Sequence, residues 1–128
     1  MSTITRITQK LIAFREARNW QQFHRPKDLA ISLTLEATEL LELFQWKNDE
    51  DVAAHIRTHK EQYADELADI FNWVLILAHD LDISIEAAAE AKIEKNGHKY
   101  PLELSRNSYQ KYTQFSHHKP KIEEHKDT

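Results

Sequence analysis

Apolar residues recur along the first hundred positions at the spacing of amphipathic α-helices. One stripe at i, i+3, i+7 and i+10 predicts a first helix, and it consists of Ile4, Ile7, Leu11 and Phe14. Ser2 or Thr3 can cap this helix, which we expect to end near Asn19. Pro26 suits the first turn of a second helix, and the leucine pattern carries that helix to about Trp46.

Two more helices complete the predicted fold. Asn48 and Asp49 offer caps for the third, which covers residues 51–80 with a break allowed near Thr58. The fourth follows a turn at 81–84 and ends at Lys95 or Asn96. Gly97, the only glycine, stands at the usual C-terminal stop position. The pattern predicts an all-α, four-helix bundle over residues 1–113. Residues 114–128 form a charged tail that we expect to be disordered.

Two of these helices carry acids on the side they should bury. Glu36 falls among the leucines of the second helix, and Glu39 lies on the edge of the same stripe. On the third helix, Glu66 shares a line with Ile70, Trp73 and Leu77, and Asp69 lies beside Trp73. Each helix therefore bears an acidic pair at i, i+3 on its apolar face.

Burying such carboxylates unpaired is unfavourable by several kcal/mol each, and together they repel one another. No arginine or lysine shares either stripe. A divalent cation resolves the conflict, and an all-carboxylate set selects a hard ion, Mg²⁺ with Mn²⁺ as a substitute. No histidine has an acid three residues before it, which disfavours a di-iron bundle. The alternative is a solvated acidic face, because acidic pairs at this spacing are common on helices.

Composition narrows the range of partners. The chain has 17 basic and 21 acidic residues and a formal net charge of −4, so no overall field attracts a nucleic acid polymer or an anionic membrane. No cysteine is present, which excludes disulfides and thiolate chemistry. No apolar run approaches the roughly 20 residues that span a bilayer. A cytoplasmic protein is expected.

Residues 70–78, apolar almost all round, predict burial against several helices, including those of a partner subunit.

The acidic pattern, Glu36-x-x-Glu39 followed by Glu66-x-x-Asp69, resembles the signature of the MazG-like, all-α nucleoside triphosphate pyrophosphohydrolases. Further blocks look similar to the dCTP pyrophosphatase branch of that family. They are NWQQFHRPKDLAISL, ELLELFQWK, DELADIFNWVLILA, KIEKNGHKYP and LSRNSYQKYT, which lie between Phe14 and Thr113.

The resemblance implies hydrolysis of a nucleoside triphosphate, most specifically dCTP or a modified dCTP, to the monophosphate and pyrophosphate, with removal of unwanted nucleotides as the role. It implies that Mg²⁺ is held by the four acids and that the chain assembles as a homodimer or homotetramer. It implies phosphate or sugar contacts from four residues near the end of the fourth helix: Lys92, Asn96, Lys99 and Tyr100. Glu39, at the stripe edge, is our hypothesis for the group that accepts a proton from water.

The same resemblance implies that Trp20 and Trp46 enclose the base. We interpret Trp73 as a core residue. His24 either orients a loop near the base or, as is more common for a lone loop histidine, is simply solvated, and we leave it outside the site. Leu11 departs from animal members, in which a histidine at this position contributes to base recognition. Two alternatives stay open: the same chemistry with another base preference, and a non-catalytic helical oligomerisation or adaptor module.

Overall fold

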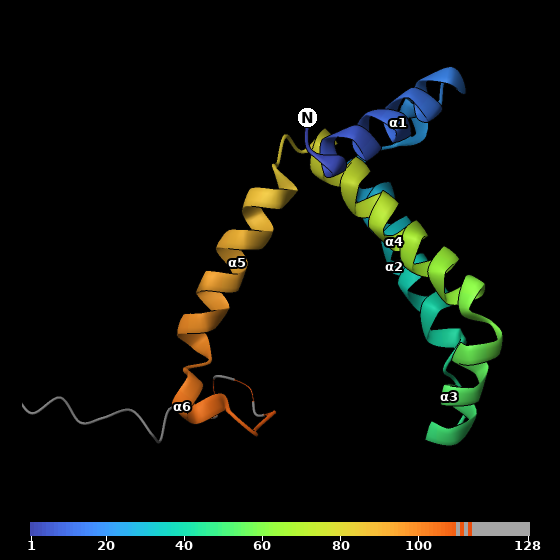
Figure 1. The fold of residues 1–128 in the computed structure, drawn as a ribbon. Coiled ribbons are helices and arrows are strands. Elements are labelled where there is room, and N and C mark those ends of the chain that lie inside the picture. Colours follow the sequence, from blue (N-terminus) through green and yellow to red (C-terminus); the bar gives the residue numbers. More distant parts are fainter. Residues whose placement is uncertain (110, 112, 114–128) are drawn as a thin grey trace, which may run out of the picture. The chain divides into compact units, whose positions relative to one another are not determined.

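The computed structural model describes residues 1–109, 111 and 113, and all of the regular structure in this part is helical (Figure 1). In chain order the elements are α1 Thr3–Ala17, the 3₁₀ helix η1 Gln21–Phe23, α2 Pro26–Glu42, α3 Asp49–Thr58, α4 Lys60–Asp80, α5 Ile85–Lys99 and α6 Leu102–Ser105. The all-α class is confirmed. The predicted tail, residues 114–128, lies outside the described residues.

The chain divides into two compact units, Met1–Ile85 and Glu86–Thr128, and each is described by itself. The first holds α1 to α4. The second holds nearly all of α5 together with α6. None of the helices in the described part of the chain has the length and apolar character needed to cross a membrane.

Local sequence signals explain where three helices of the first unit begin. The Ser2 hydroxyl accepts a hydrogen bond from the Thr5 amide at 3.0 Å, which satisfies one of the free donors at the start of α1. Pro26 occupies the first turn of α2, where its missing N–H removes no helical hydrogen bond. The Asn48 side chain caps α3 by accepting from the Asp51 amide at 2.9 Å. These starts agree with the sequence pattern.

The core of the first unit lies between α2 and α4, which run side by side, while α1 packs near one end of α4 (Figure 1). Leu29 of α2 and Leu75 of α4 are both 1% exposed. Ile76, Ala78 and Tyr63 of α4 complete the buried apolar set. Since burial of a leucine side chain stabilises by roughly 1.5–3 kcal/mol, this small set makes α2 and α4 one rigid pair.

A buried ion pair ties α1 to the end of α4. The Arg15 guanidinium donates to both carboxylate oxygens of Asp80, at 2.7 and 2.8 Å, across 65 positions of sequence. Only 8% of the Arg15 side chain and 18% of the Asp80 side chain are exposed. The pair raises the pKa of Arg15 and lowers that of Asp80, in each case chiefly through these hydrogen bonds.

The break allowed near Thr58 is present, because α3 ends at Thr58 and His59 leaves helical geometry with φ −128° before α4 begins. The Thr58 hydroxyl donates to the Ala54 carbonyl at 3.1 Å at this end. Helix ends differ from the sequence pattern at two other places. α2 ends at Glu42, and Trp46 lies in the following turn with φ 67°. α5 continues through Gly97 to Lys99, so Gly97 is not a helix stop.

Candidate functional site

Three glutamates from the two paired helices form an acidic cluster. Glu36 and Glu39 come from α2 and Glu66 from α4, and one carboxylate oxygen of each lies within 4.8 Å of the others. The i, i+3 spacing on α2 places its two acids on neighbouring turns, and the side-by-side packing of α2 and α4 brings Glu66 opposite them. We call these three residues the acidic cluster.

The environment of the acidic cluster disfavours its charge. The Oε2 atoms of Glu36 and Glu66 are buried and have no hydrogen-bond partner. Burial, interaction with Glu39 and the charge of Asp69 together raise the pKa of Glu36 to about 7. Burial first, and then the charges of Glu39 and Asp69, raise the pKa of Glu66. A cation placed beside two such carboxyl groups would favour their charged form and would be a partner for the two Oε2 atoms.

The residues of the acidic cluster fit a divalent metal ion. Neither ion pair found among the described residues involves them, so no protein cation neutralises them there. Their ligand atoms are all carboxylate oxygens, the donors that hard cations such as Mg²⁺ prefer. A cation would satisfy the two enclosed Oε2 atoms and relieve the mutual repulsion.

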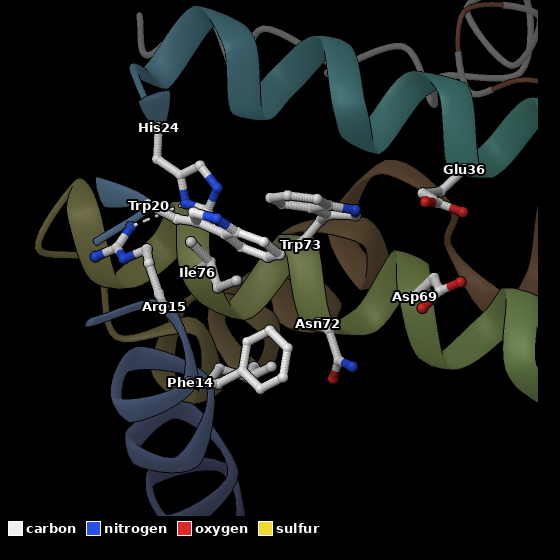
Figure 2. Close-up of a pocket in the computed structure, with 10 residues that line it drawn as sticks. Phe14, Arg15, Trp20, His24, Glu36, Asp69, Asn72, Trp73 and Ile76 are labelled. Atoms are coloured by element: carbon white, nitrogen blue, oxygen red, sulfur yellow. Dashed lines mark hydrogen bonds between the residues drawn. The ribbon is translucent and has the colours of Figure 1, made fainter. Parts of the chain in front are cut away.

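Asp69 stands one helical turn beyond Glu66 on α4, outside the group of three. Its side chain and that of Glu36 are turned toward the space between the two helices at one end of a pocket (Figure 2). Its charge contributes to the raised pKa values of both Glu36 and Glu66, so it acts on the cluster electrostatically. The fourth predicted acid is therefore a neighbour of the cluster in this conformation.

The pocket has a volume of about 420 Å³, is built wholly from the first unit and has two chemically different ends (Figure 2). Glu36 and Asp69 line its acidic end. Away from these acids the lining is mainly aromatic and apolar, from Leu11, Phe14, Trp20, Trp73 and Ile76. Arg15 and His24 complete it. The amide of Asn72, on the same helix as both Asp69 and Trp73, also lines the pocket. A cavity of this size and lining suits a planar ring with a charged group attached.

Ring contacts hold the aromatic walls in place. Phe14 and Trp20 meet edge to face with centroids 5.8 Å apart. The Arg18 guanidinium lies over the Phe14 ring at 3.5 Å and donates to the Phe14 carbonyl at 3.0 Å. On the other side, the rings of His24 and Trp73 meet edge to face at 5.4 Å. Such contacts are worth about 0.5–1.5 kcal/mol each, enough to keep the rings oriented without a ligand.

His24 is also in contact with the Arg15–Asp80 pair. Arg15 Nη1 lies 3.5 Å from His24 Nδ1. Burial, and secondly the Arg15 charge, lower the pKa of His24. The Asp80 charge opposes this effect but does not outweigh it, so the site favours the neutral imidazole.

The other residues predicted for substrate binding are distributed over both units. Trp20 lies at the pocket, 44% exposed. Trp46 is 93% exposed and does not line the pocket. The four predicted phosphate or sugar contacts belong to the second unit, on α5 or directly after it, and all are exposed: Lys92, Asn96, Lys99 and Tyr100.

Two interpretations drawn from the sequence were wrong. Trp73 is not a core residue, since it is half-buried and lines the pocket. His24 is not a solvated loop residue, since it packs against Trp73 and lines the same pocket. A signal for Trp73 existed, because it shares the helical line of Glu66. Asn72 had a local signal as well, because it lies three residues after Asp69 and next to Trp73. Arg15 had none, because its partner Asp80 is 65 positions away.

Two helices that present carboxylates to one another beside an aromatic pocket define an all-α protein with a candidate metal site. The MazG-like family profile matches residues 31–115. The chain belongs to the MazG-like family.

Individual relatives agree with this assignment. A protein from Bos taurus named dCTP pyrophosphatase 1 is 39% identical over 106 residues, which are 81% of this chain and 63% of the relative. The Homo sapiens protein of the same name is 36% identical over 106 residues, 81% of this chain and 62% of its own length. The chain thus spans about three fifths of the length of these curated relatives.

A solved structure extends the comparison to three dimensions. The crystal structure of a pyrophosphatase from Archaeoglobus fulgidus superposes with a TM-score of 0.75 at 33% sequence identity. The match covers 79% of this chain and 94% of the archaeal one.

Proposed function

We propose that this chain is an enzyme, a nucleoside triphosphate pyrophosphohydrolase that converts dCTP, or a base-modified dCTP, to the monophosphate and pyrophosphate. The role of such an enzyme is to remove unwanted nucleotides from the pool. The names of the bovine and human relatives and of the archaeal structure support the chemistry. A cytoplasmic location belongs to the same proposal, because the proposed substrates are found there.

One observation carries the proposal: Glu36 is shared by the acidic cluster and the aromatic pocket. A nucleotide has an aromatic base at one end and a polyanion at the other. An aromatic pocket that opens onto a set of carboxylates suits such a molecule only if a cation lies between the carboxylates and the phosphates. The site thus supports a ligand that arrives with a divalent ion.

Mg²⁺, with Mn²⁺ as a substitute, is the proposed cofactor. Glu36, Glu39 and Glu66 would hold it, with Asp69 as a fourth ligand after a small movement of its side chain. When bound, the ion supplies charge neutralisation at phosphoryl oxygens and lowers the pKa of a coordinated water. The unpartnered Oε2 atoms of Glu36 and Glu66 support this assignment.

The side chains of the first unit then have distinct proposed tasks. Trp20 and Phe14 on one side and Trp73 on the other offer ring surfaces for a base, an interaction worth about 1–3 kcal/mol per stacked base. Glu39 is the most exposed member of the acidic cluster, and we assign its carboxylate the proton of the attacking water. Its exposure supports this task because an acid open to solvent can pass the proton on.

The second unit contributes the proposed phosphate and sugar contacts. Lys92 and Asn96 lie at i, i+4 on one face of α5, and Lys99 and Tyr100 follow at its C-terminal end. An ammonium group and an amide on one helical face suit the charged and hydroxylated parts of a nucleotide. Lys92→Ala is expected to raise KM for the triphosphate without changing Mg²⁺ affinity.

A homodimer or homotetramer is the proposed assembly. Both helices of the rigid pair expose large apolar side chains: Ile31, Leu35 and Leu41 on α2, and Leu67 and Phe71 on α4. Trp46, 93% exposed after the end of α2, is proposed to contact the base from a neighbouring subunit. Sedimentation at micromolar concentration tests the assembly, and a monomer would contradict it.

The catalytic proposal is tested by incubating the protein with each dNTP, and with modified dCTPs, in the presence of Mg²⁺, and measuring pyrophosphate. We expect release to be fastest with dCTP or its modified forms. Glu66→Gln should abolish release, whereas Glu42→Gln, an exposed acid on the same α2 helix as Glu36, should not. No release from any nucleotide would favour the adaptor alternative.

A further inference from the structure

We propose that Arg15 and Asp80 are positioning residues that hold His24 with its proton on Nε2, so that His24 donates a hydrogen bond to a ring carbonyl of the bound base. The proposal rests on the proposed function in one respect, namely that a nucleobase occupies the pocket. It assigns the pocket a substrate class: nucleotides whose base bears a carbonyl oxygen.

Arg15 is held in one orientation by Asp80. Both of its terminal nitrogens are bonded to the Asp80 carboxylate, at 2.7 and 2.8 Å, and only 8% of its side chain is exposed. A bidentate pair of this kind fixes the plane of the guanidinium as well as its position. Asp80 is further oriented by His79 Nδ1, 3.1 Å from its Oδ1. Arg15 therefore presents its Nη1 to His24 in one orientation.

The contact with Arg15 selects one tautomer of His24. Arginine has donors only, and it remains protonated at any pH that a folded protein tolerates. Arg15 Nη1 lies 3.5 Å from His24 Nδ1, so a proton on Nδ1 would face a donor and a positive charge. Nδ1 must therefore carry the lone pair. In a neutral imidazole the proton is then on Nε2.

The proton on His24 Nε2 points away from Arg15. The Nδ1 side of the His24 ring faces Arg15, and the opposite side is turned toward Trp73 and the interior of the pocket (Figure 2). No hydrogen bond to His24 Nε2 occurs among the described residues. The edge-to-face contact with Trp73, at 5.4 Å between centroids, keeps the ring from turning. The N–H of Nε2 is thus a preset donor aimed into the pocket.

A fixed N–H donor on His24 discriminates among nucleobases. It favours an acceptor on the base, and an exocyclic carbonyl oxygen projects further beyond the ring than a ring nitrogen does. Cytosine, uracil, thymine and guanine each carry such a carbonyl, whereas the acceptors of adenine are ring nitrogens only. A site built to hydrogen-bond one group rejects an analogue that lacks it, because its own polar atom is then left unpaired. His24 thus separates carbonyl-bearing bases from adenine and does not choose among them.

The direct test is the tautomer itself. In ¹⁵N-labelled protein at neutral pH, two-bond correlations between the imidazole nitrogens and carbon-bound protons distinguish a protonated Nδ1 from a protonated Nε2. We expect the His24 proton on Nε2. In the double variant Arg15→Met with Asp80→Leu, which removes both charges and so leaves neither one buried and unpaired, we expect a mixture of tautomers. A proton on Nδ1 in the unmodified protein would overturn the proposal.

The functional test uses two matched substitutions. The amide nitrogen of glutamine can occupy the place of His24 Nε2, whereas that of asparagine reaches only the place of Nδ1. The probes are dCTP and the matching C-nucleoside triphosphate of 2-aminopyridine, a neutral base that keeps the ring nitrogen and amino group of cytosine and has a C–H where cytosine has its carbonyl. Unmodified protein should prefer dCTP by about ten-fold in kcat/KM, the effect of one well-made hydrogen bond. His24→Gln should keep most of that preference, and His24→Asn should lose it.

The kinetic signature separates this role from a structural one. Because the carbonyl is distant from the reacting phosphorus, the preference should appear in KM, with kcat nearly equal for the two probes. Equal preference in the His24→Gln and His24→Asn variants would contradict the assignment. Were no triphosphate hydrolysed, the proposed function would fail, while the tautomer measurement and equilibrium binding of the two probes would still decide this inference.

Discussion

Replacing Asp80 by asparagine removes one half of the ion pair that joins α1 to the C-terminal end of α4. The amide keeps one oxygen for Arg15 but loses the charge and the second acceptor. Because only 8% of the Arg15 side chain is exposed, the guanidinium stays charged where water cannot replace what is lost. Breaking a buried pair costs about 3–5 kcal/mol and breaking an exposed one below about 1 kcal/mol.

The Asp80 side chain is 18% exposed, so the expected loss lies below the buried limit, at about 2–3 kcal/mol of the free energy of unfolding. Urea unfolding followed by the helical circular dichroism signal measures it. With a urea slope of about 2 kcal/mol/M for a chain of this size, the midpoint should fall by roughly 1 M. Proteins are compared at equal concentration, because association would add to stability. Asp82→Asn, in the exposed turn after α4, is the matched control and should change little.

The pH dependence gives the sign of the effect. The Arg15 hydrogen bonds lower the pKa of Asp80 in the folded state, so the folded protein binds a proton at this site less readily than the unfolded chain. The contribution of the pair is therefore complete above the unfolded pKa, about 3.9, and is lost as pH falls toward the folded value. The gap between the two proteins should narrow below about pH 4. A gap below 0.5 kcal/mol at pH 7, or one unchanged at pH 3, would refute the reasoning.

Three further outcomes are expected. Glu36→Gln should weaken Mg²⁺ binding, measured by calorimetry, by at least about ten-fold, and unchanged affinity would exclude Glu36 as a ligand. Tyr63→Phe should destabilise by about 1 kcal/mol in urea, because the buried Tyr63 hydroxyl lies 2.6 Å from His55 Nδ1 and donates to the Leu43 carbonyl at 3.2 Å. A stability equal to that of the unmodified protein would mean that these bonds are not formed. Trp20→Ala should raise KM for dCTP by about ten-fold with kcat retained, and a fall in kcat alone would contradict a stacking role.

The sequence predicted those parts of the fold that depend on neighbouring residues. Ser2, Pro26 and Asn48 identify helix starts because the cap or first-turn residue is itself the signal. Helix ends were less readable. Glycine is common just after a helix, and this intrinsic preference is the only argument for a stop at Gly97. A Cβ at this position would meet nothing within 4 Å, so no close approach requires a glycine there. The helical hydrogen bonds of α5 outweigh the preference, and the helix continues to Lys99.

The site divides in the same way. The acids of α2 and α4 were recognisable from periodicity, because an anion within an apolar stripe is a local contradiction. The pocket was not, because it is made by tertiary contacts. Arg15 reads as an ordinary charged residue until its partner, 65 positions away, is known. Trp73 reads as core because sequence cannot tell a cavity wall from a packed interior.

The three tryptophans of this chain occupy environments that differ in a useful way. Trp20 and Trp73 line one cavity, and Trp46 stands almost fully in water after the end of α2. Indole emission responds to its surroundings, so a molecule entering the cavity of a single chain should alter the emission of Trp20 and Trp73. The emission of Trp46 should change only when a second chain covers it, alone or together with the bound base. A change at Trp46 therefore reports self-association without any added dye.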